Sequence, residues 1–66
     1  MSTLGDEYPK MQARVRALIE VYKEIGPAGT FGRIMIEQVL ERADRAAISG
    51  DVVAMIRSFK EMEECE

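Results

Sequence analysis

The chain has 66 residues, of which 47% are hydrophobic and 32% are charged, and its formal net charge is −3. This composition indicates a single globular domain over residues 1–66, because it is too apolar for a disordered chain and too charged for a membrane span. The acidic balance disfavours a general nucleic-acid binder, which needs surplus Lys and Arg to neutralise phosphates. With no His and one Cys, Cys65, these residues cannot form a usual Cys/His zinc site or an internal disulfide.

Large apolar residues recur at alternating steps of four and three from Leu4 to Ile25. This heptad spacing is typical of one helix face. We expect a helix over about residues 7–25, with Asp6 as its N-cap and Gly26 in the left-handed conformation after its end. The predicted face consists of Leu4, Tyr8, Met11, Val15, Leu18, Tyr22 and Ile25.

A second apolar pattern predicts a helix over about residues 28–49, which begins at Pro27 or only after Thr30. Gly50 ends this helix, and Asp51 caps a third helix over about residues 52–64. A connection this short forces the second and third helices into a tight antiparallel hairpin. The predicted face of the second helix is Ile36, Val39, Leu40, Ala43, Ala46 and Ala47, and that of the third is Val52, Met55, Ile56, Phe59 and Met62.

The predicted fold class is therefore all-α, a small bundle of three helices. A core of this size rarely supplies more than ~3–5 kcal/mol, and neither a metal nor a disulfide supplements it. We expect the chain to associate with itself as a homodimer or higher oligomer.

The heptad of the first helix has two interpretations: it packs against the helical hairpin as ordinary core, or it forms part of a seam between molecules. On the second helix, Phe31, Ile34 and Ile48 fall off the main face and predict a second apolar surface, although single exposed apolar residues are normal. The candidate interface comprises Met11, Val15, Leu18, Tyr22, Ile25, Phe31, Ile34 and Ile48.

Three glycines, Gly26, Gly29 and Gly32, lie three apart just before or within the start of the second helix. They are consistent with an anion site built from backbone N–H groups and Arg33, but they match no phosphate-binding motif. We favour a structural interpretation, in which they form a turn and let two helices approach closely.

Opposite charges four residues apart predict ion pairs along the helices. The predicted pairs are Arg16–Glu20, Arg33–Glu37, Glu41–Arg45 and Arg57–Glu61.

No combination of residues predicts catalysis, a cofactor or a metal, because His is absent and three short helices rarely enclose a cleft. We expect a protein that is not an enzyme. Arg33, Arg42 and Arg45 predict a basic strip on the second helix, but acidic residues interrupt it.

The runs Tyr22–Gly32 and Ala43–Met55 resemble short helical accessory proteins encoded by temperate, lambdoid-type phages and prophages. The resemblance carries no catalytic motif. It implies a phage-borne protein that acts in the host cytoplasm by binding a host or phage protein. The alternative is a small dimeric transcription regulator that binds DNA, and a third interpretation is a virion or assembly component.

Overall fold

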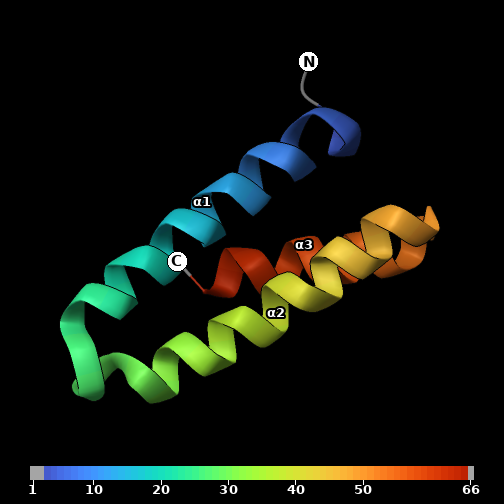
Figure 1. Ribbon diagram of the computed structural model, residues 1–66. Coiled ribbons are helices and arrows are strands. Elements are labelled where there is room, and N and C mark those ends of the chain that lie inside the picture. The colour runs from blue at the N-terminus through green and yellow to red at the C-terminus, as the bar shows by residue number, and fades with distance from the viewer. Residues whose placement is uncertain (1–2, 66) are drawn as a thin grey trace.

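The computed structural model describes residues 3–65, and every regular element within this range is helical. The elements are α1 (Leu4–Ile25), a short 3₁₀ turn η1 (Gly26–Gly29), α2 (Thr30–Ser49) and α3 (Val52–Glu64). Figure 1 shows α2 and α3 running antiparallel side by side, while α1 joins α2 through η1 and packs against both. The predicted all-α class is confirmed for the described residues.

α1 begins earlier than predicted, because Thr3 and not Asp6 is its N-cap. The Thr3 hydroxyl oxygen accepts a hydrogen bond from the backbone N–H of Asp6 at 3.2 Å. Asp6 instead lies in the first turn, where its carboxylate faces the positive end of the helix dipole. Thr and Asp are both favourable N-cap residues, and the structure uses Thr3.

The connection between α1 and α2 depends on an unusual backbone at Gly26, with φ 82° and ψ −146°. The positive φ agrees with the prediction, but this ψ is extended and not that of the left-handed helix, so that part of the prediction is wrong. Such a conformation is open to glycine and strained for other residues. Pro27 then lies in the first turn of η1, and the α-helix proper begins at Thr30, the later of the two predicted starts.

The turn between α2 and α3 has the predicted capping chemistry. Gly50 is left-handed, with φ 70° and ψ 16°, and its N–H donates to the carbonyl of Ala46 at 3.1 Å. The Asp51 carboxylate accepts a hydrogen bond from the backbone N–H of Ala54 at 3.1 Å. These two residues close one helix and start the next, which fixes the antiparallel arrangement.

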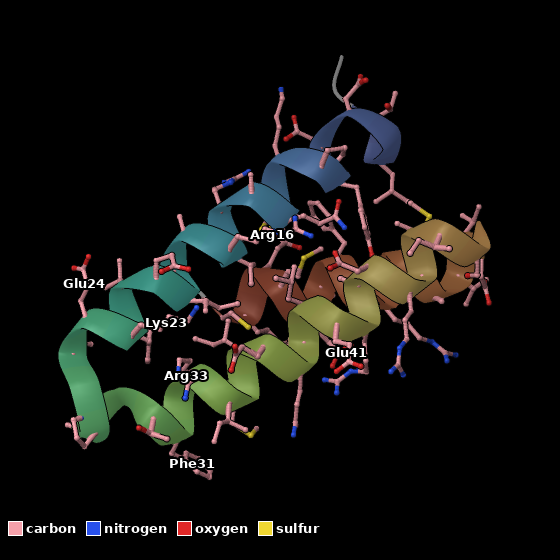
Figure 2. All side chains as sticks on the ribbon, viewed as in Figure 1. Arg16, Lys23, Glu24, Phe31, Arg33 and Glu41 are labelled. Carbon is pink, nitrogen blue, oxygen red and sulfur yellow. The ribbon has the colours of Figure 1, made fainter. Side chains whose placement is uncertain are left out.

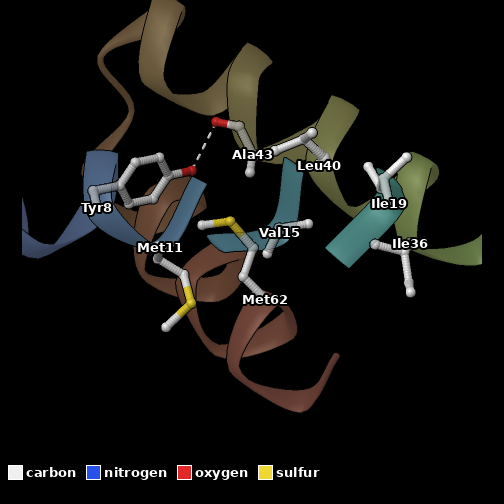
Figure 3. Packing of buried hydrophobic residues seen from close by; sticks show 8 residues of the cluster. All are labelled: Tyr8, Met11, Val15, Ile19, Ile36, Leu40, Ala43 and Met62. Carbon is white, nitrogen blue, oxygen red and sulfur yellow. Dashed lines mark hydrogen bonds between the residues drawn. The ribbon is translucent and has the colours of Figure 1, made fainter. Parts of the chain in front are cut away.

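The core lies where the three helices meet (Figure 3). Its buried members are Tyr8, Met11, Val15 and Ile19 of α1, Ile36, Leu40 and Ala43 of α2, and Met62 of α3. On α1, Ile19 is buried, whereas the heptad pattern predicted that Leu18 would be; Leu18 is only half-buried. A straight helix turns every 3.6 residues, so its buried face drifts by ~20° per heptad away from a strict 3.5-residue repeat.

The buried side of α3 also differs from the predicted one. Val52 and Ile56 are exposed by 58% and 55%, whereas Ser58 is 5% exposed. α3 contacts both α1 and α2, so its buried side is the one that faces the angle between them. On α2, the predicted face residue Ala47 is likewise exposed, near the end of the helix.

Candidate functional site

The structure divides the predicted interface residues between the core and the surface. Met11 and Val15 are 4% and 0% exposed and pack within the chain's own core, so they are removed from the candidate interface. Leu18 and Tyr22 are half-buried against the same core. The remaining four are exposed: Ile25 by 54%, Phe31 by 77%, Ile34 by 45% and Ile48 by 87%.

Phe31 and Ile34 lie near the start of α2, whereas Ile48 lies near its end. Because a helix rises 1.5 Å per residue, Ile34 and Ile48 are about 20 Å apart along the axis, so they do not form one surface. Met35, which is 50% exposed, follows Phe31 by one helical turn. We call Phe31, Ile34 and Met35 the outer cluster, and Figure 2 shows Phe31 pointing away from α1.

A second exposed apolar group surrounds the α2–α3 turn. It consists of Ile48, Val52, Val53 and Ile56, exposed by 87%, 58%, 59% and 55%, and we call it the tip cluster. The apolar pattern of residues 52–64 predicted a buried face that includes Val52 and Ile56 and does not include Val53, but all three are exposed. Three apolar residues over five positions of one short helix were a signal that they could not all face inward.

The glycines before and within α2 serve close packing of α1 against α2. A Cβ on Gly29 would lie 2.8 Å from the backbone oxygen of Tyr22, and one on Gly32 would lie 2.5 Å from Cε2 of the Tyr22 ring. Arg33, the residue expected to assist an anion, donates to Glu37 at 3.0 Å. This geometry supports the structural interpretation of the glycines.

Arg16 forms an ion pair between α1 and α2, whereas the sequence predicted that it would pair within α1. Arg16 donates to both carboxylate oxygens of Asp44 at 3.0 Å, and Gln12 donates to the same carboxylate at 2.7 Å. In Figure 2, Arg16 lies on the side of α1 that faces α2. The predicted Arg16–Glu20 pair is therefore wrong, because the carboxylate of the neighbouring helix takes the guanidinium.

Between α2 and α3, too, an ion pair between helices replaces a pair predicted within one helix. Arg42 donates to Glu61 at 2.8 Å, so the predicted Arg57–Glu61 pair is also wrong. The predicted Arg33–Glu37 and Glu41–Arg45 pairs are confirmed.

The predicted basic strip is not continuous along α2. Arg33 lies at the far end of the helix, paired with Glu37, whereas Arg42 and Arg45 line a groove together with Arg57 of α3. The contribution of α3 was not visible in the sequence, because it depends on how the two helices pair.

Tyr8, whose side chain lies between the helices, titrates differently from a free phenol. Burial raises the pKa of the Tyr8 phenol above its usual value of 10.0, and the negative charge of Asp44 adds to the rise, while a hydrogen bond with Ser58 opposes it. Tyr8 is only 2% exposed, and its hydroxyl donates to a backbone carbonyl, so its role is structural.

Within residues 3–65, no group of three or more acidic, Cys or His side chains is placed to hold a metal ion. None of the helices in this range combines the length and apolar character needed to cross a bilayer. No family model, curated protein or solved structure matches this chain.

Proposed function

We propose that this protein is a non-enzymatic interaction protein that docks onto another protein through the outer cluster. The observation that carries the proposal is the exposure of three large apolar side chains, Phe31, Ile34 and Met35, by 77%, 45% and 50% at one end of α2. Grouped apolar side chains on a small domain are typical of docking surfaces, and an aromatic residue often supplies the anchor.

The helix beneath the outer cluster is firmly supported. Gly29 and Gly32 bring α2 against Tyr22 of α1, and Ile36 anchors the same part of α2 in the core. An exposed cluster on a fixed helix loses little conformational entropy on binding, which favours affinity.

The resemblance to small phage and prophage accessory proteins supports a partner from the host or the phage. We propose that the protein acts as such a factor in the host cytoplasm, modulating a protein rather than catalysing a reaction. Because the resemblance carries no site, the partner has to be identified by capture.

We also propose that the three-helix bundle forms a homodimer or higher oligomer. Two members of the tip cluster support this, because Val52 and Ile56, one helical turn apart on α3, would leave water in a contact between copies. Analytical ultracentrifugation over a dilution series tests it: a mass that falls toward one chain on dilution is expected, and a single-chain mass at every concentration would contradict it.

A tagged pull-down from host-like lysate, treated with nuclease and read by mass spectrometry, tests the docking proposal. The double variant Phe31→Ala/Ile34→Ala is expected to lose the captured protein while its helicity by circular dichroism is unchanged. The matched control is Val21→Ala, which removes an exposed apolar side chain of α1 that belongs to neither the outer cluster nor the tip cluster. Equal capture by the wild type and the Phe31→Ala/Ile34→Ala variant would refute the outer cluster as the docking surface.

The alternative, a DNA-binding regulator, is favoured by one observation, the gathering of Arg42, Arg45 and Arg57 on one side of the hairpin. Salt separates the two functions. Binding through phosphate contacts weakens steeply as salt is added, whereas binding through the apolar outer cluster changes little. Capture that disappears after nuclease treatment would favour the DNA-binding function over docking onto a protein.

A further inference from the structure

A groove follows the seam between α2 and α3 on the side away from the core. It has a volume of about 410 Å³, and its base is made of small side chains, because Ala46 and Ser49 of α2 face Ala54 and Ser58 of α3. Small residues on both helices leave the seam hollow between the longer side chains at its edges.

Those longer side chains are mostly cationic. Arg42, Arg45 and Arg57 line the groove, and Glu61 is the one carboxylate among the lining residues. Arg42 is held by Glu61 at 2.8 Å, while Arg45 pairs with Glu41, outside the groove. Within residues 3–65 the structure shows no ion pair for Arg57. The groove therefore has a local surplus of positive charge in a chain whose net charge is −3.

The existing pairing of Arg45 is easily exchanged. The side chains of Arg45 and Glu41 are 74% and 60% exposed, and exposed ion pairs of this kind contribute little to stability. A carboxylate brought by a partner can therefore replace Glu41 without disturbing the fold. Arg57 can receive a second carboxylate directly.

Exposed apolar side chains adjoin the arginines. Ile48, one helical turn from Arg45, is 87% exposed, and Val53, one turn from Arg57, is 59% exposed. Both lie outside the groove lining, and Ile48 lines a neighbouring hollow with Glu41 and Asp44. A nucleic-acid backbone presents phosphates but little that would cover Ile48 and Val53. A protein segment carrying both carboxylates and apolar side chains complements both features.

We infer that the α2–α3 groove binds an acidic, partly apolar helical segment of a partner protein, with the partner's carboxylates on Arg45 and Arg57 and its apolar side chains reaching beyond the groove lining to Ile48 and Val53. This inference rests on the proposed function, since it names the chemistry of one partner segment. It assigns that segment to the groove, which is separate from the outer cluster.

Fluorescence anisotropy with labelled peptides on the whole chain tests the inference. The probe is a helical peptide of about 14 residues, roughly the length of α3, with Glu and Leu placed on one face. A second peptide with Lys in place of every Glu and a short DNA duplex serve as comparison probes. The test variant is Arg45→Ala/Arg57→Ala, which leaves the structural Arg42–Glu61 pair intact, and the matched control is Lys10→Ala/Lys23→Ala, which removes the same charge from α1.

The Glu/Leu peptide is expected to bind the wild type, to bind more weakly as salt is added, and to lose about tenfold in affinity in the Arg45→Ala/Arg57→Ala variant. The Lys10→Ala/Lys23→Ala variant and the Phe31→Ala/Ile34→Ala variant are expected to keep the wild-type affinity. No binding of the Glu/Leu peptide, or an equal loss in the Lys10→Ala/Lys23→Ala control, overturns the inference. Tighter binding of the duplex, lost on removal of the two arginines, overturns it in favour of nucleic acid.

These results are distinguishable from failure of the proposed function. If the pull-down captures a protein through the outer cluster while the Glu/Leu peptide does not bind, the groove inference fails and the proposed function stands. If the Glu/Leu peptide binds as expected while the Phe31→Ala/Ile34→Ala variant still captures the protein, the docking surface of the proposed function fails and the groove inference stands.

Discussion

The hydroxyl of Tyr8 donates a hydrogen bond to the backbone carbonyl of Ala43 at 2.7 Å, and this buried contact ties α1 to α2 (Figure 3). The ring of Tyr8 also packs against Phe59 of α3, with the ring centroids 6.4 Å apart. The side chain of Tyr8, on α1, therefore contacts both other helices.

The Tyr8→Phe variant keeps the ring and removes the hydroxyl. We expect the free energy of unfolding to fall by about 1 kcal/mol, because a buried hydrogen bond is lost while the packing is kept. Urea denaturation followed by circular dichroism measures it. The matched control is Tyr22→Phe, since the structure shows no hydrogen bond of the Tyr22 hydroxyl within residues 3–65, and an equal loss in both variants would contradict the assigned role of the Tyr8–Ala43 bond.

The raised pKa of Tyr8 predicts a loss of stability in alkali. Burial favours the neutral phenol, so the folded state holds the proton more tightly than the unfolded state, in which the phenol titrates near 10. The stabilising contribution is complete below the unfolded pKa and is lost as the pH rises through the folded pKa. We expect the stability difference between wild type and Tyr8→Phe to shrink above about pH 10, in urea titrations at several pH values; a difference that is constant with pH would contradict this.

The glycines of the α1–α2 connection are expected to differ in their tolerance of alanine. Gly29→Ala would place a Cβ 2.8 Å from the backbone oxygen of Tyr22, which cannot move cheaply, so we expect a cost of about 1–3 kcal/mol. Gly32→Ala meets the Tyr22 ring, whose side chain can rotate, and it gains helix propensity, so its cost is expected to be smaller.

Gly5→Ala is the control for these two variants. Its new Cβ would lie 3.7 Å from the nearest atom, the Thr3 hydroxyl oxygen, which is ordinary contact. We expect it to be neutral or to stabilise α1 by up to about 1 kcal/mol through helix propensity. Thermal melts rank the three variants, and a Gly29→Ala protein as stable as Gly5→Ala would contradict the close approach of α1 and α2.

Asp44 accepts hydrogen bonds from Gln12 and Arg16 across the α1–α2 contact. The charged groups are partly exposed, so we expect Asp44→Ala to cost only about 1 kcal/mol or less. Glu20→Ala is expected to cost less than Asp44→Ala, because Arg16 is engaged by Asp44 and not by Glu20. Denaturation at low and high salt measures the loss of stability in each variant. A larger loss in Glu20→Ala than in Asp44→Ala would contradict the Arg16–Asp44 pair and favour an Arg16–Glu20 pair within α1.

The N-cap of α1 gives a further test. Thr3→Ala removes the hydroxyl that accepts from the N–H of Asp6, and we expect it to cost about 1 kcal/mol. Asp6→Ala removes only the attraction of a first-turn carboxylate to the helix dipole, which contributes about 0.3–1 kcal/mol at low ionic strength. Salt therefore separates them: added salt should reduce the effect of Asp6→Ala and leave that of Thr3→Ala, and a salt-dependent Thr3→Ala effect would contradict the capping assignment.

Local rules predicted much of the backbone of this protein. The positive φ at Gly26 and Gly50 and the capping by Asp51 depend on a few adjacent residues, so they can be derived without the fold. The exposure of Phe31, Ile34 and Ile48 also follows from helical periodicity, because a residue off the main stripe of its own helix faces outward. Their role in binding stays a prediction.

Choices between near-equivalent residues depended on the tertiary structure. Whether Leu18 or Ile19 is buried, and whether Ile56 or Ser58 faces the core, depends on where the neighbouring helices lie and not on the sequence of one helix. The same holds for Arg16, which has carboxylates within reach on two helices and pairs with Asp44. Contacts between helices depend on the angle and position at which the helices cross, and periodicity along a single helix does not predict either.

The sequence by itself determined that the chain is helical, where it turns and which side chains leave the main faces, because these follow from periodicity, caps and glycine. Only the tertiary structure decided that Met11 and Val15 belong to the core, that Phe31 and Ile48 lie at opposite ends of α2, and that Arg57 joins Arg42 and Arg45 at one groove. Those relations join residues that are remote in the chain, and only the packing of one helix on another brings them together or keeps them apart.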